Sequence, residues 1–185
     1  MRVLVACEFS GAVRNAFSSL GHDAWSCDLL PSETEGKHIQ GDVLSVLEDG
    51  WDLMIAHPPC TYLSYAGARW FKTQPDRMAK ARAAFDFFMA LVNAPIPYIA
   101  VENPRGFPLQ WYRRSDQKVH PYHFGEAATK ETHLWLKGLP VLLYTQRHIN
   151  PVVNWTEKNR RSAKDRSKTF PKFALAMAQQ WGYRS

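Results

Sequence analysis

The sequence predicts an α/β protein with a mostly parallel sheet and helices on both faces of the sheet. Short apolar runs alternate with helix-like segments through roughly the first hundred residues. The clearest helical pattern lies between two of these runs, and polar residues follow directly where the runs end. Strands that alternate with helices pair in parallel through right-handed crossovers, which gives this fold class.

The predicted strands are short apolar runs with a turn or a polar residue at each end. In chain order they cover residues 2–7, 23–27, 38–40, 51–56, 98–101 and 132–136. We expect residues 141–144 to continue the last strand at the sheet edge, and residues 61–73 to form a loop. After residue 107 the alternation of strands and helices becomes looser.

Helices are predicted over residues 12–20, 44–48 and 173–181. The most distinct helix lies before Pro95, where the apolar residues from Met78 to Val92 recur at helical spacing. Thr73 and Asp76 predict a capping box at its start. This helix connects two predicted strands, as a parallel sheet requires.

Two of the predicted strands end in residues that can carry chemistry. The strand over residues 51–56 leads into His57-Pro58-Pro59-Cys60, and the strand over residues 98–101 leads into Glu102-Asn103-Pro104. The carboxyl ends of parallel strands meet at one edge of a sheet, where open α/β folds bind their ligands. We therefore expect Cys60 and Glu102 to face one cleft.

A thiolate beside a carboxylic acid suits attack on an activated ring such as a pyrimidine. Two prolines stiffen the loop before Cys60, which suits a nucleophile that must be positioned. We expect burial to raise the pKa of Glu102, so that it can donate a proton at neutral pH. The alternatives are a structural cysteine and a glutamate that pairs with Arg105.

The turn Glu8-Phe9-Ser10-Gly11 lies between the first predicted strand and the first predicted helix. Backbone N–H groups at the start of a helix can hold a carboxylate or a phosphate. A nucleotide or S-adenosylmethionine site fits here, with Asp28 at the end of the next strand as the ribose acceptor. The alternative is an ordinary turn, because a dinucleotide fingerprint needs more glycines.

Composition excludes several other classes. The chain has 185 residues and 45% hydrophobic content, which predicts one folded domain over residues 1–185 and not a disordered chain. No run of about 18 apolar residues predicts a membrane span, and the N-terminus lacks a signal peptide pattern. The three cysteines have no metal-binding spacing, so we expect a cytoplasmic protein without a disulfide framework or a metal site.

Basic residues are concentrated near the C-terminus, and the formal net charge is +6. A basic run of this kind favours contact with nucleic acid, with a solvated tail as the alternative. The residues from which we expect this contact are Arg105, Lys164, Arg166 and Lys168.

In chain order these residues resemble the motifs of the cytosine-5 DNA methyltransferases, most closely a short phage-type branch. Residues 8–11 resemble the first cofactor motif, and Asp28 and Asp42 match the acidic residues after the second and third strands. Pro59-Cys60 resembles the catalytic Pro-Cys pair, and Glu102-Asn103 resembles the Glu-Asn pair. The resemblance implies a Rossmann-like, S-adenosylmethionine-dependent methyltransferase fold.

The resemblance also implies a mechanism. The thiolate of Cys60 adds to C6 of cytosine, and Glu102 engages N3 and the exocyclic amine. C5 then takes the methyl group of S-adenosylmethionine, which residues 8–11 and Pro59 help to bind. In duplex DNA the target base must first be flipped out of the helix. By its position, Lys130 is the best substitute for a later basic motif of the family.

The chain departs from the family in three places. Val13 replaces the second glycine of the cofactor loop, and the Q-x-R-x-R strand has no counterpart. Only about sixty residues separate Glu102 from Arg166, which leaves no room for a separate target-recognition domain. The chain could act on DNA, alone or as a homodimer. The alternatives are an enzyme for a free pyrimidine nucleotide and a catalytically silent DNA-binding protein of the same fold.

Overall fold

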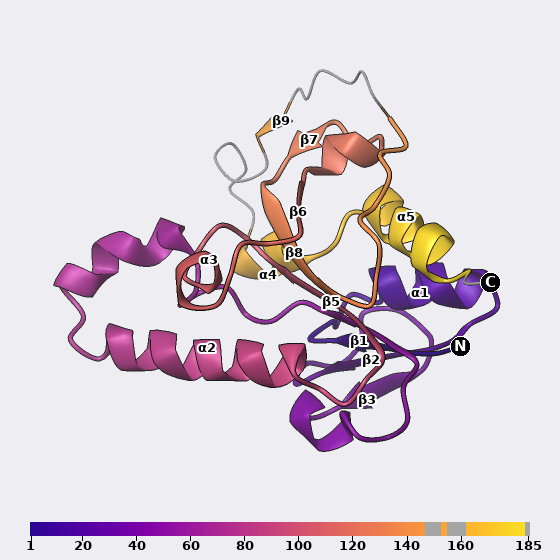
Figure 1. Ribbon diagram of the computed structural model, residues 1–185, viewed down its shortest axis with the longest axis horizontal. Coiled ribbons are helices and arrows are strands. Elements are labelled where there is room, and N and C mark those ends of the chain that lie inside the picture. Colours follow the sequence, from indigo (N-terminus) through magenta and orange to yellow (C-terminus); the bar gives the residue numbers. More distant parts are fainter. Residues whose placement is uncertain (147–152, 155–161, 184–185) are drawn as a thin grey trace.

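The computed structural model describes residues 1–146, 153–154 and 162–183. Its centre is a seven-stranded sheet with the order β3-β2-β1-β4-β5-β8-β6 (Figure 1). The strands of this sheet are β1 (Arg2–Ala6), β2 (Asp23–Asp28), β3 (His38–Gln40), β4 (Leu53–Ala56), β5 (Tyr98–Asn103), β6 (Gln117–Val119) and β8 (Thr132–Lys137). A small second sheet pairs β7 (Ala128–Thr129) with β9 (Val153–Asn154).

The helices lie mainly between these strands and at the C-terminal end of the chain. The α-helices are α1 (Ala12–Ser19), α2 (Arg77–Val92), α3 (Pro108–Trp111), α4 (Ala163–Ser167) and α5 (Pro171–Trp181). Three further segments are 3₁₀ helices: η1 (Val43–Val46), η2 (Tyr65–Lys72) and η3 (Pro121–Phe124).

The five strands from β1 to β5 are parallel to one another, and β8 runs antiparallel to both β5 and β6. The predicted α/β fold with a mostly parallel sheet is therefore confirmed. The order β3-β2-β1-β4-β5 matches the 3-2-1-4-5 order of doubly wound sheets, in which the strand order reverses between the first and fourth strands. Ligands of such sheets bind beside the carboxyl ends of these two strands.

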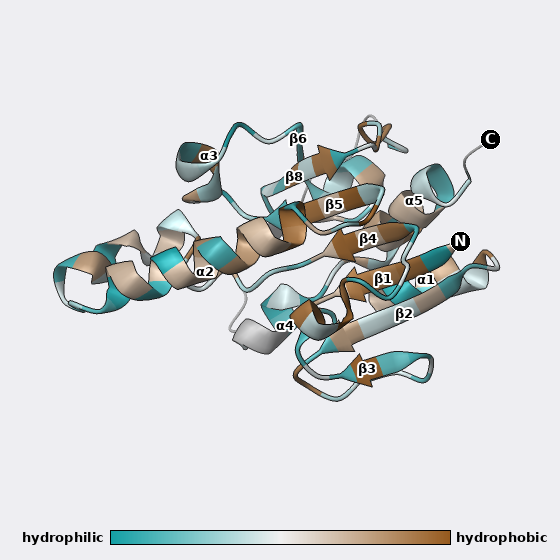
Figure 2. Ribbon diagram, turned by 60° about the horizontal axis from the view of Figure 1, so that its bottom comes forward, coloured by the Kyte–Doolittle hydropathy of each residue, from teal (hydrophilic) through white to brown (hydrophobic). Residues whose placement is uncertain are grey.

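Helices cover both faces of the sheet, as predicted (Figures 1 and 2). Side chains of a strand alternate between the two faces. In β1, Val3 and Val5 join the core beneath α1 and α5, whereas Leu4 and Ala6 join the core beneath α2 and η1. Because both faces are covered, the central strands β1, β4 and β5 are apolar at most positions, which Figure 2 shows in brown.

Three local predictions were wrong. The expected loop over residues 61–73 contains η2, which tertiary contacts stabilise and apolar periodicity does not reveal. The capping box at the start of α2 does not form, and the Asp76 side chain pairs with Lys80 instead. Residues 141–144 are not a strand, because Leu142 exchanges its backbone hydrogen bonds with the side chain of Gln117.

Candidate active site

The register of β4 and β5 brings His57 and Glu102 together. Ala56 pairs with Val101, so the next two residues, His57 and Glu102, are neighbours on one face of the sheet. His57 Nδ1 lies 2.9 Å from Glu102 Oε2, and only 7% and 11% of the two side chains are exposed. Glu102 is therefore part of β5 and lies inside the protein, at the edge where we expected the site.

The strand β5 also holds the loop that carries Cys60. The buried Asn103 side chain donates a hydrogen bond from Nδ2 to the Pro58 carbonyl oxygen at 2.9 Å. Cys60 then accepts hydrogen bonds at its own carbonyl oxygen from the N–H groups of Leu63 and Ser64, which forms a tight turn. The prolines and these hydrogen bonds together fix the position of the thiol.

The loop after β5 crosses the loop after Cys60 at close range. The Phe107 N–H donates to the Leu63 carbonyl oxygen at 2.8 Å, and the Tyr65 N–H donates to the Arg105 carbonyl oxygen at 3.2 Å. A glycine is needed at position 106, because a Cβ on Gly106 would collide with the Leu63 carbonyl group. The two loops that follow the catalytic candidates are thus joined through their backbones.

Glu102 is ionised at neutral pH in the free protein. Burial pushes its pKa upward, but the Lys130 charge, the hydrogen bond and charge of His57 and a hydrogen bond from Thr132 outweigh burial, so the pKa lies below its usual range. The expectation that burial makes Glu102 a proton donor at neutral pH is therefore wrong for the free protein. Its carboxylate is an acceptor until a ligand brings a proton.

Cys60 is exposed at the surface, but protein atoms on the inner side of its thiol exclude water from that side. This partial burial raises the pKa of the thiol. The Glu102 carboxylate raises this pKa further, whereas Lys130 and Arg166 lower it. The charges of Glu102, Lys130 and Arg166 therefore lie within electrostatic reach of the Cys60 thiol. The structure thus places Cys60 and Glu102 near each other, whereas the cleft that we expect them to share stays a prediction, because neither residue lines the groove or the cavity described below.

Lys130 belongs to the same site. It is half-buried just before β8, and its Nζ donates a hydrogen bond to the Arg166 carbonyl oxygen in α4 at 3.2 Å. Its charge lowers the pKa of both Cys60 and Glu102. The third residue with a predicted catalytic role therefore lies beside the other two.

The turn at residues 8–11 differs from the expected anion site. Glu8 is buried, and its carboxylate accepts hydrogen bonds from the N–H groups of Val13 at 2.7 Å and Arg14 at 3.1 Å. The chain's own carboxylate therefore occupies the backbone donors at the start of α1 that we expected to hold a ligand. Gly11 begins the helix in the left-handed conformation, with φ of 74°.

Arg14 is a buried residue that sequence reasoning missed. Its guanidinium group donates hydrogen bonds to Ser26 in β2 and to Ser32, Thr34 and Glu35 in the loop that follows β2. The loop is thereby fixed against the start of α1. An arginine without any exposed surface is rare, and the sequence pattern contains no signal for it.

A groove with a volume of about 560 Å³ lies beside this turn. The residues that line it are Ser10, Ala12, Glu33, Asp165, Lys168, Thr169, Phe170 and Pro171. Lys168 binds Glu33 at 2.7 Å and Asp165 at 3.5 Å, and it lies 6.0 Å from the centre of the Phe9 ring. The groove therefore has an aromatic residue and charges of both signs in its walls.

The other predicted cofactor residues lie near the same edge of the sheet. Burial is the main cause of the raised pKa of Cys7, and the charges of Asp28 and Asp42 raise this pKa further. The two aspartates therefore lie near Cys7, where the carboxyl ends of β1, β2 and β3 meet. Each aspartate also accepts a hydrogen bond from a backbone N–H group of its own turn, from Leu30 and Leu44 respectively. Neither aspartate is among the described residues that line the groove.

The predicted DNA contacts have different positions. Arg105 and Arg166 are exposed, and Arg166 lies close enough to Cys60 to lower its pKa. Lys168 forms an ion pair with Glu33 in the wall of the groove. The side chain of Lys164 lies outside the described part of the chain. Pro59 is exposed beside Cys60.

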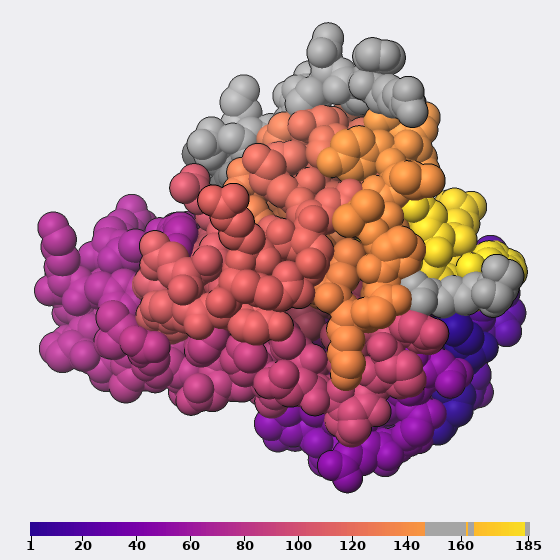
Figure 3. All heavy atoms as spheres, viewed as in Figure 1, coloured from indigo at the N-terminus to yellow at the C-terminus, as the bar shows by residue number. Residues whose placement is uncertain are grey.

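A projecting segment next to Cys60 is a second feature that we did not predict. This basic arm (residues 61–82) consists of a loop, η2 and the start of α2, and it extends to the left of the sheet in Figures 1 and 3. It contains five lysine or arginine residues and one aspartate, and hence carries +4 of the chain's net charge of +6. Its exposed basic and aromatic residues are Arg69, Trp70, Lys72, Lys80 and Arg82.

A buried arginine anchors the basic arm. Arg77 donates a hydrogen bond to the Thr61 carbonyl oxygen at 3.0 Å and lies 5.2 Å from the centre of the Tyr62 ring. Arg77 also lies 5.4 Å from the centre of the Phe71 ring, and Phe71 packs against Phe107 with 5.4 Å between ring centres. The arm is thus fixed next to the loops that carry Cys60 and Glu102.

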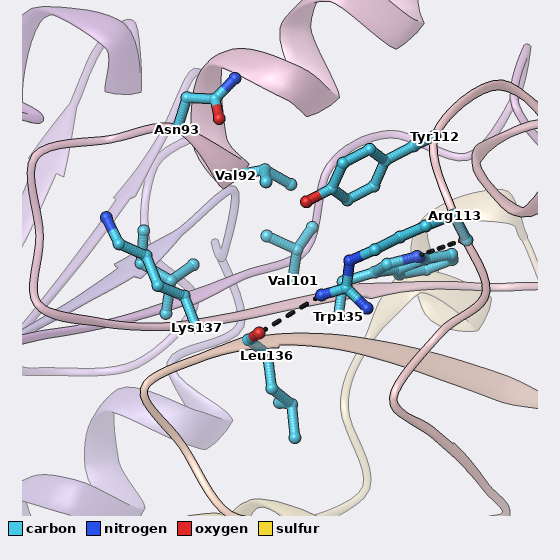
Figure 4. Close-up of a pocket in the computed structure, with 9 residues that line it drawn as sticks. Val92, Asn93, Val101, Tyr112, Arg113, Trp135, Leu136 and Lys137 are labelled. Atoms are coloured by element: carbon cyan, nitrogen blue, oxygen red, sulfur yellow. Dashed lines mark hydrogen bonds between the residues drawn. The ribbon is translucent and has the colours of Figure 1, made fainter.

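A separate cavity of about 300 Å³ lies on the face of the sheet that is opposite to the Glu102 carboxylate (Figure 4). Val101, Tyr112 and Trp135 line it, and the Trp135 Nε1 donates a hydrogen bond to the Arg113 carbonyl oxygen at 3.1 Å. Val101 points to the face away from Glu102, because neighbouring residues of a strand alternate. This cavity therefore lies on the other side of the sheet from the Glu102 carboxylate.

The chain matches no protein-family model and no curated protein. Among solved structures, it resembles an E. coli protein described as a "putative DNA modification methyltransferase" encoded within a prophage. The two are 15% identical, with a TM-score of 0.47, and the likeness covers 74% of this chain and 46% of that protein. So distant a likeness carries no argument about the chemistry of this chain.

Two features are absent from the part of the chain that the structure describes. None of the helices described here is long and apolar enough to cross a membrane. Residues 1–146, 153–154 and 162–183 contain no group of three or more His, Cys, Asp or Glu side chains that could hold a metal ion.

Proposed function

We propose that the chain is an S-adenosylmethionine-dependent methyltransferase that acts on C5 of cytosine in DNA. The observation that carries this proposal is the shared site of Cys60, Glu102 and Lys130 at the carboxyl edge of the sheet. A thiol, a carboxylate and a cation within electrostatic reach of one another are what nucleophilic addition to a pyrimidine ring requires. The resemblance of the motifs to the cytosine-5 methyltransferases supports the same assignment.

Cys60 attacks C6 of the target cytosine as a thiolate, and the proton that the thiol gives up passes through water to the Glu102 carboxylate. The new S–C6 bond uses the electron pair of sulfur, and the electrons of the C5–C6 double bond move into the ring toward N3. Because the thiol's pKa is raised, the free protein holds mostly the protonated form at neutral pH. Lys130 and Arg166 favour the thiolate and so assist the attack.

Glu102, once it carries the proton that the Cys60 thiol has released, donates this proton to N3 and accepts a hydrogen bond from the exocyclic amine of the base. The proton on N3 neutralises the electron density that the attack of Cys60 moves into the ring. Once C5 carries the methyl group, water takes the C5 proton and N3 returns its proton to Glu102, so that the C5–C6 double bond is restored and the S–C6 bond breaks. The thiolate of Cys60 is then free for another cycle.

The groove beside Ser10 has the size and the chemistry to hold S-adenosylmethionine. Its volume of about 560 Å³ lies within the range of small-molecule sites. Lys168 pairs with Glu33 and Asp165 in the free protein, and a bound ligand would exchange these ion pairs for its own, with its ammonium group on the two carboxylates and its carboxylate on Lys168. When bound, this cofactor supplies an electrophilic methyl group. Ser10 lines the groove and Phe9 lies near Lys168 in its wall, so the groove lies close to the carboxyl end of β1.

The basic arm supports DNA as the substrate over a free nucleotide. Its exposed cations can neutralise phosphates, and the exposed Trp70, with Arg69 at 4.8 Å from its ring, can stack on an unpaired base. A mononucleotide would need no such surface beside Cys60. The arm would then supply the contacts to the DNA backbone that a separate domain provides in longer members of the family.

Transfer of labelled methyl groups from S-adenosylmethionine to cytosine-containing DNA tests the proposal. Wild type should label DNA at C5 of cytosine, and Cys60→Ala should lose at least about 10³-fold in rate, because the nucleophile is gone. Cys27→Ala is the matched control, since Cys27 is a buried cysteine of β2. Full activity of Cys60→Ala would refute the mechanism. Labelling of dCMP but not of DNA would show that the substrate is a free nucleotide.

A second candidate is a DNA-binding protein of this fold without catalytic activity. The occupation of the α1 backbone donors by Glu8 favours it, because those donors are then closed to a ligand. Titration calorimetry with S-adenosylmethionine distinguishes the two candidates. Saturable binding supports the enzyme, whereas no heat of binding together with tight DNA binding supports the second candidate.

A further inference from the structure

His57 makes a contact that neither the sequence motifs nor the proposed chemistry explains. Its backbone N–H continues the β1–β4 ladder by donating to the Ala6 carbonyl oxygen at 2.9 Å. Because Pro58 follows, the backbone of His57 is held in an extended conformation. Its side chain consequently points to the same face as Glu102 and has little freedom to turn away.

The two ring nitrogens of His57 have different surroundings. Nδ1 lies 2.9 Å from Glu102 Oε2. Nε2 is buried, and among the described residues it has no hydrogen-bond partner. A buried polar group without a partner destabilises the fold. We therefore infer that the contact of Nδ1 with Glu102 is the function of this histidine.

We propose that His57 is the positioning residue for Glu102: it donates its Nδ1–H to one carboxylate oxygen and leaves the other oxygen for the target base. Through this contact His57 also helps to keep the pKa of Glu102 low, and we expect that low pKa to set the acidic limit of the reaction. Only the kinetic part of this inference rests on the proposed function. The pairing itself is a property of the free protein.

The other groups around Glu102 do not replace His57. Thr132, on β8, helps to lower the pKa of Glu102 but carries no charge, and its hydroxyl group donates to the Lys130 carbonyl oxygen, whereas Lys130 acts on Glu102 through its charge. Cys60 comes from the loop after β4, and Arg166 of α4 acts on Cys60. Among these groups, His57 is the one that makes a short hydrogen bond to the carboxylate, at 2.9 Å.

Two variants separate positioning from packing. His57→Ala removes the N–H donor, so we expect kcat/KM to fall by about 10²-fold through misplacement of Glu102. His57→Asn keeps an amide N–H close to the position of Nδ1, and we expect it to recover all but about 10-fold of the activity. His22→Asn is the matched control, because His22 also has a buried Nε2 without a partner among the described residues but has no carboxylate beside it.

The decisive readout is the pH profile of kcat/KM. Loss of the histidine removes one cause of the lowered pKa of Glu102. The acidic limb of the profile should therefore move to higher pH in His57→Asn and stay unchanged in His22→Asn. An unchanged acidic limb, or a His57→Ala variant within about twofold of wild-type kcat/KM, overturns the inference.

A second measurement does not depend on activity. Carbon-13 NMR of the Glu102 carboxyl group should show protonation at higher pH in His57→Asn than in wild type. If wild type transfers no methyl group, the proposed function fails while this titration still tests the pairing. If His57→Ala does not fold, His57→Asn and the titration decide, and an unshifted titration overturns the inference.

Discussion

Glu102 is a buried carboxylate that stays ionised because its neighbours outweigh the cost of burial. Lys130, His57 and Thr132 hold its pKa below the usual range. A carboxylate whose pKa is lower in the folded than in the unfolded state stabilises the fold above its unfolded pKa. This stabilisation is lost as the pH falls through the folded pKa.

The pH dependence of stability follows from this sign. Below a pH of about 4.3, the ordinary pKa of glutamate, the free energy of unfolding should begin to lose the contribution of Glu102. Glu102→Gln cannot titrate, so its stability should fall less steeply with acid than that of wild type. Urea denaturation of both proteins across this range measures the difference. Parallel curves for the two proteins would contradict the assignment of Glu102 as a stabilising carboxylate.

Arg14 gives a second prediction for a single residue. Arg14→Met removes the buried guanidinium group that holds the loop after β2 against β2 and the start of α1. We expect a loss of about 2–4 kcal/mol in the free energy of unfolding. Arg82→Met is the control, because Arg82 is exposed and stacks on Trp111, and it should lose at most about 1 kcal/mol. Equal losses in the two variants would show that Arg14 has no special role.

The loops at the carboxyl ends of β4 and β5 act as one element because their backbones are joined. Gly106 lies at the crossing, where a Cβ would collide with the Leu63 carbonyl group. We expect Gly106→Ala to cost about 1–3 kcal/mol in stability and to lower methyl transfer, because Cys60 and Glu102 move relative to each other. Gly41→Ala is the control, since a Cβ there meets no atom within 4 Å. Thermal unfolding and activity assays of both variants measure the effect, and similar results for the two would contradict it.

The basic arm predicts where DNA binds. Arg69→Glu should weaken DNA binding and reduce the slope of log K against log salt by about one unit or more, since a phosphate contact is lost. Lys137→Glu introduces the same charge change at the far end of β8, beside Ala94 and away from Cys60. Fluorescence anisotropy at several salt concentrations compares the two. A larger effect of Lys137→Glu would place the DNA surface elsewhere.

At the level of elements, the sequence predicts what depends on local pattern. The strands β1, β2, β4 and β5 and the helix α2 have clear apolar patterns, and all of them form. η2 has no such pattern, because Arg77 and the ring of Phe107 hold it through contacts distant in the sequence. Pattern alone could not have shown that this segment is ordered.

At the level of the whole molecule, the candidate site was predictable in part. The rule that parallel strands end at one edge placed Cys60 and Glu102 together without any structure. The pairing of His57 with Glu102 could also have been found, by extending the register of the two strands by one residue. The lowered pKa of Glu102 could not, because it depends on Lys130 and Thr132, whose approach to β5 comes from the antiparallel strand β8.

One measurement tests the central claim most directly. A DNA oligonucleotide that carries 5-fluorocytosine should trap the protein in the presence of S-adenosylmethionine, because the C–F bond at C5 does not release fluorine in place of a proton. We predict a methylated base attached to the peptide that contains Cys60, no adduct with Cys60→Ala, and much less with Glu102→Gln. Methyl transfer to normal DNA without any trapped adduct, or an adduct at another residue, would contradict the account.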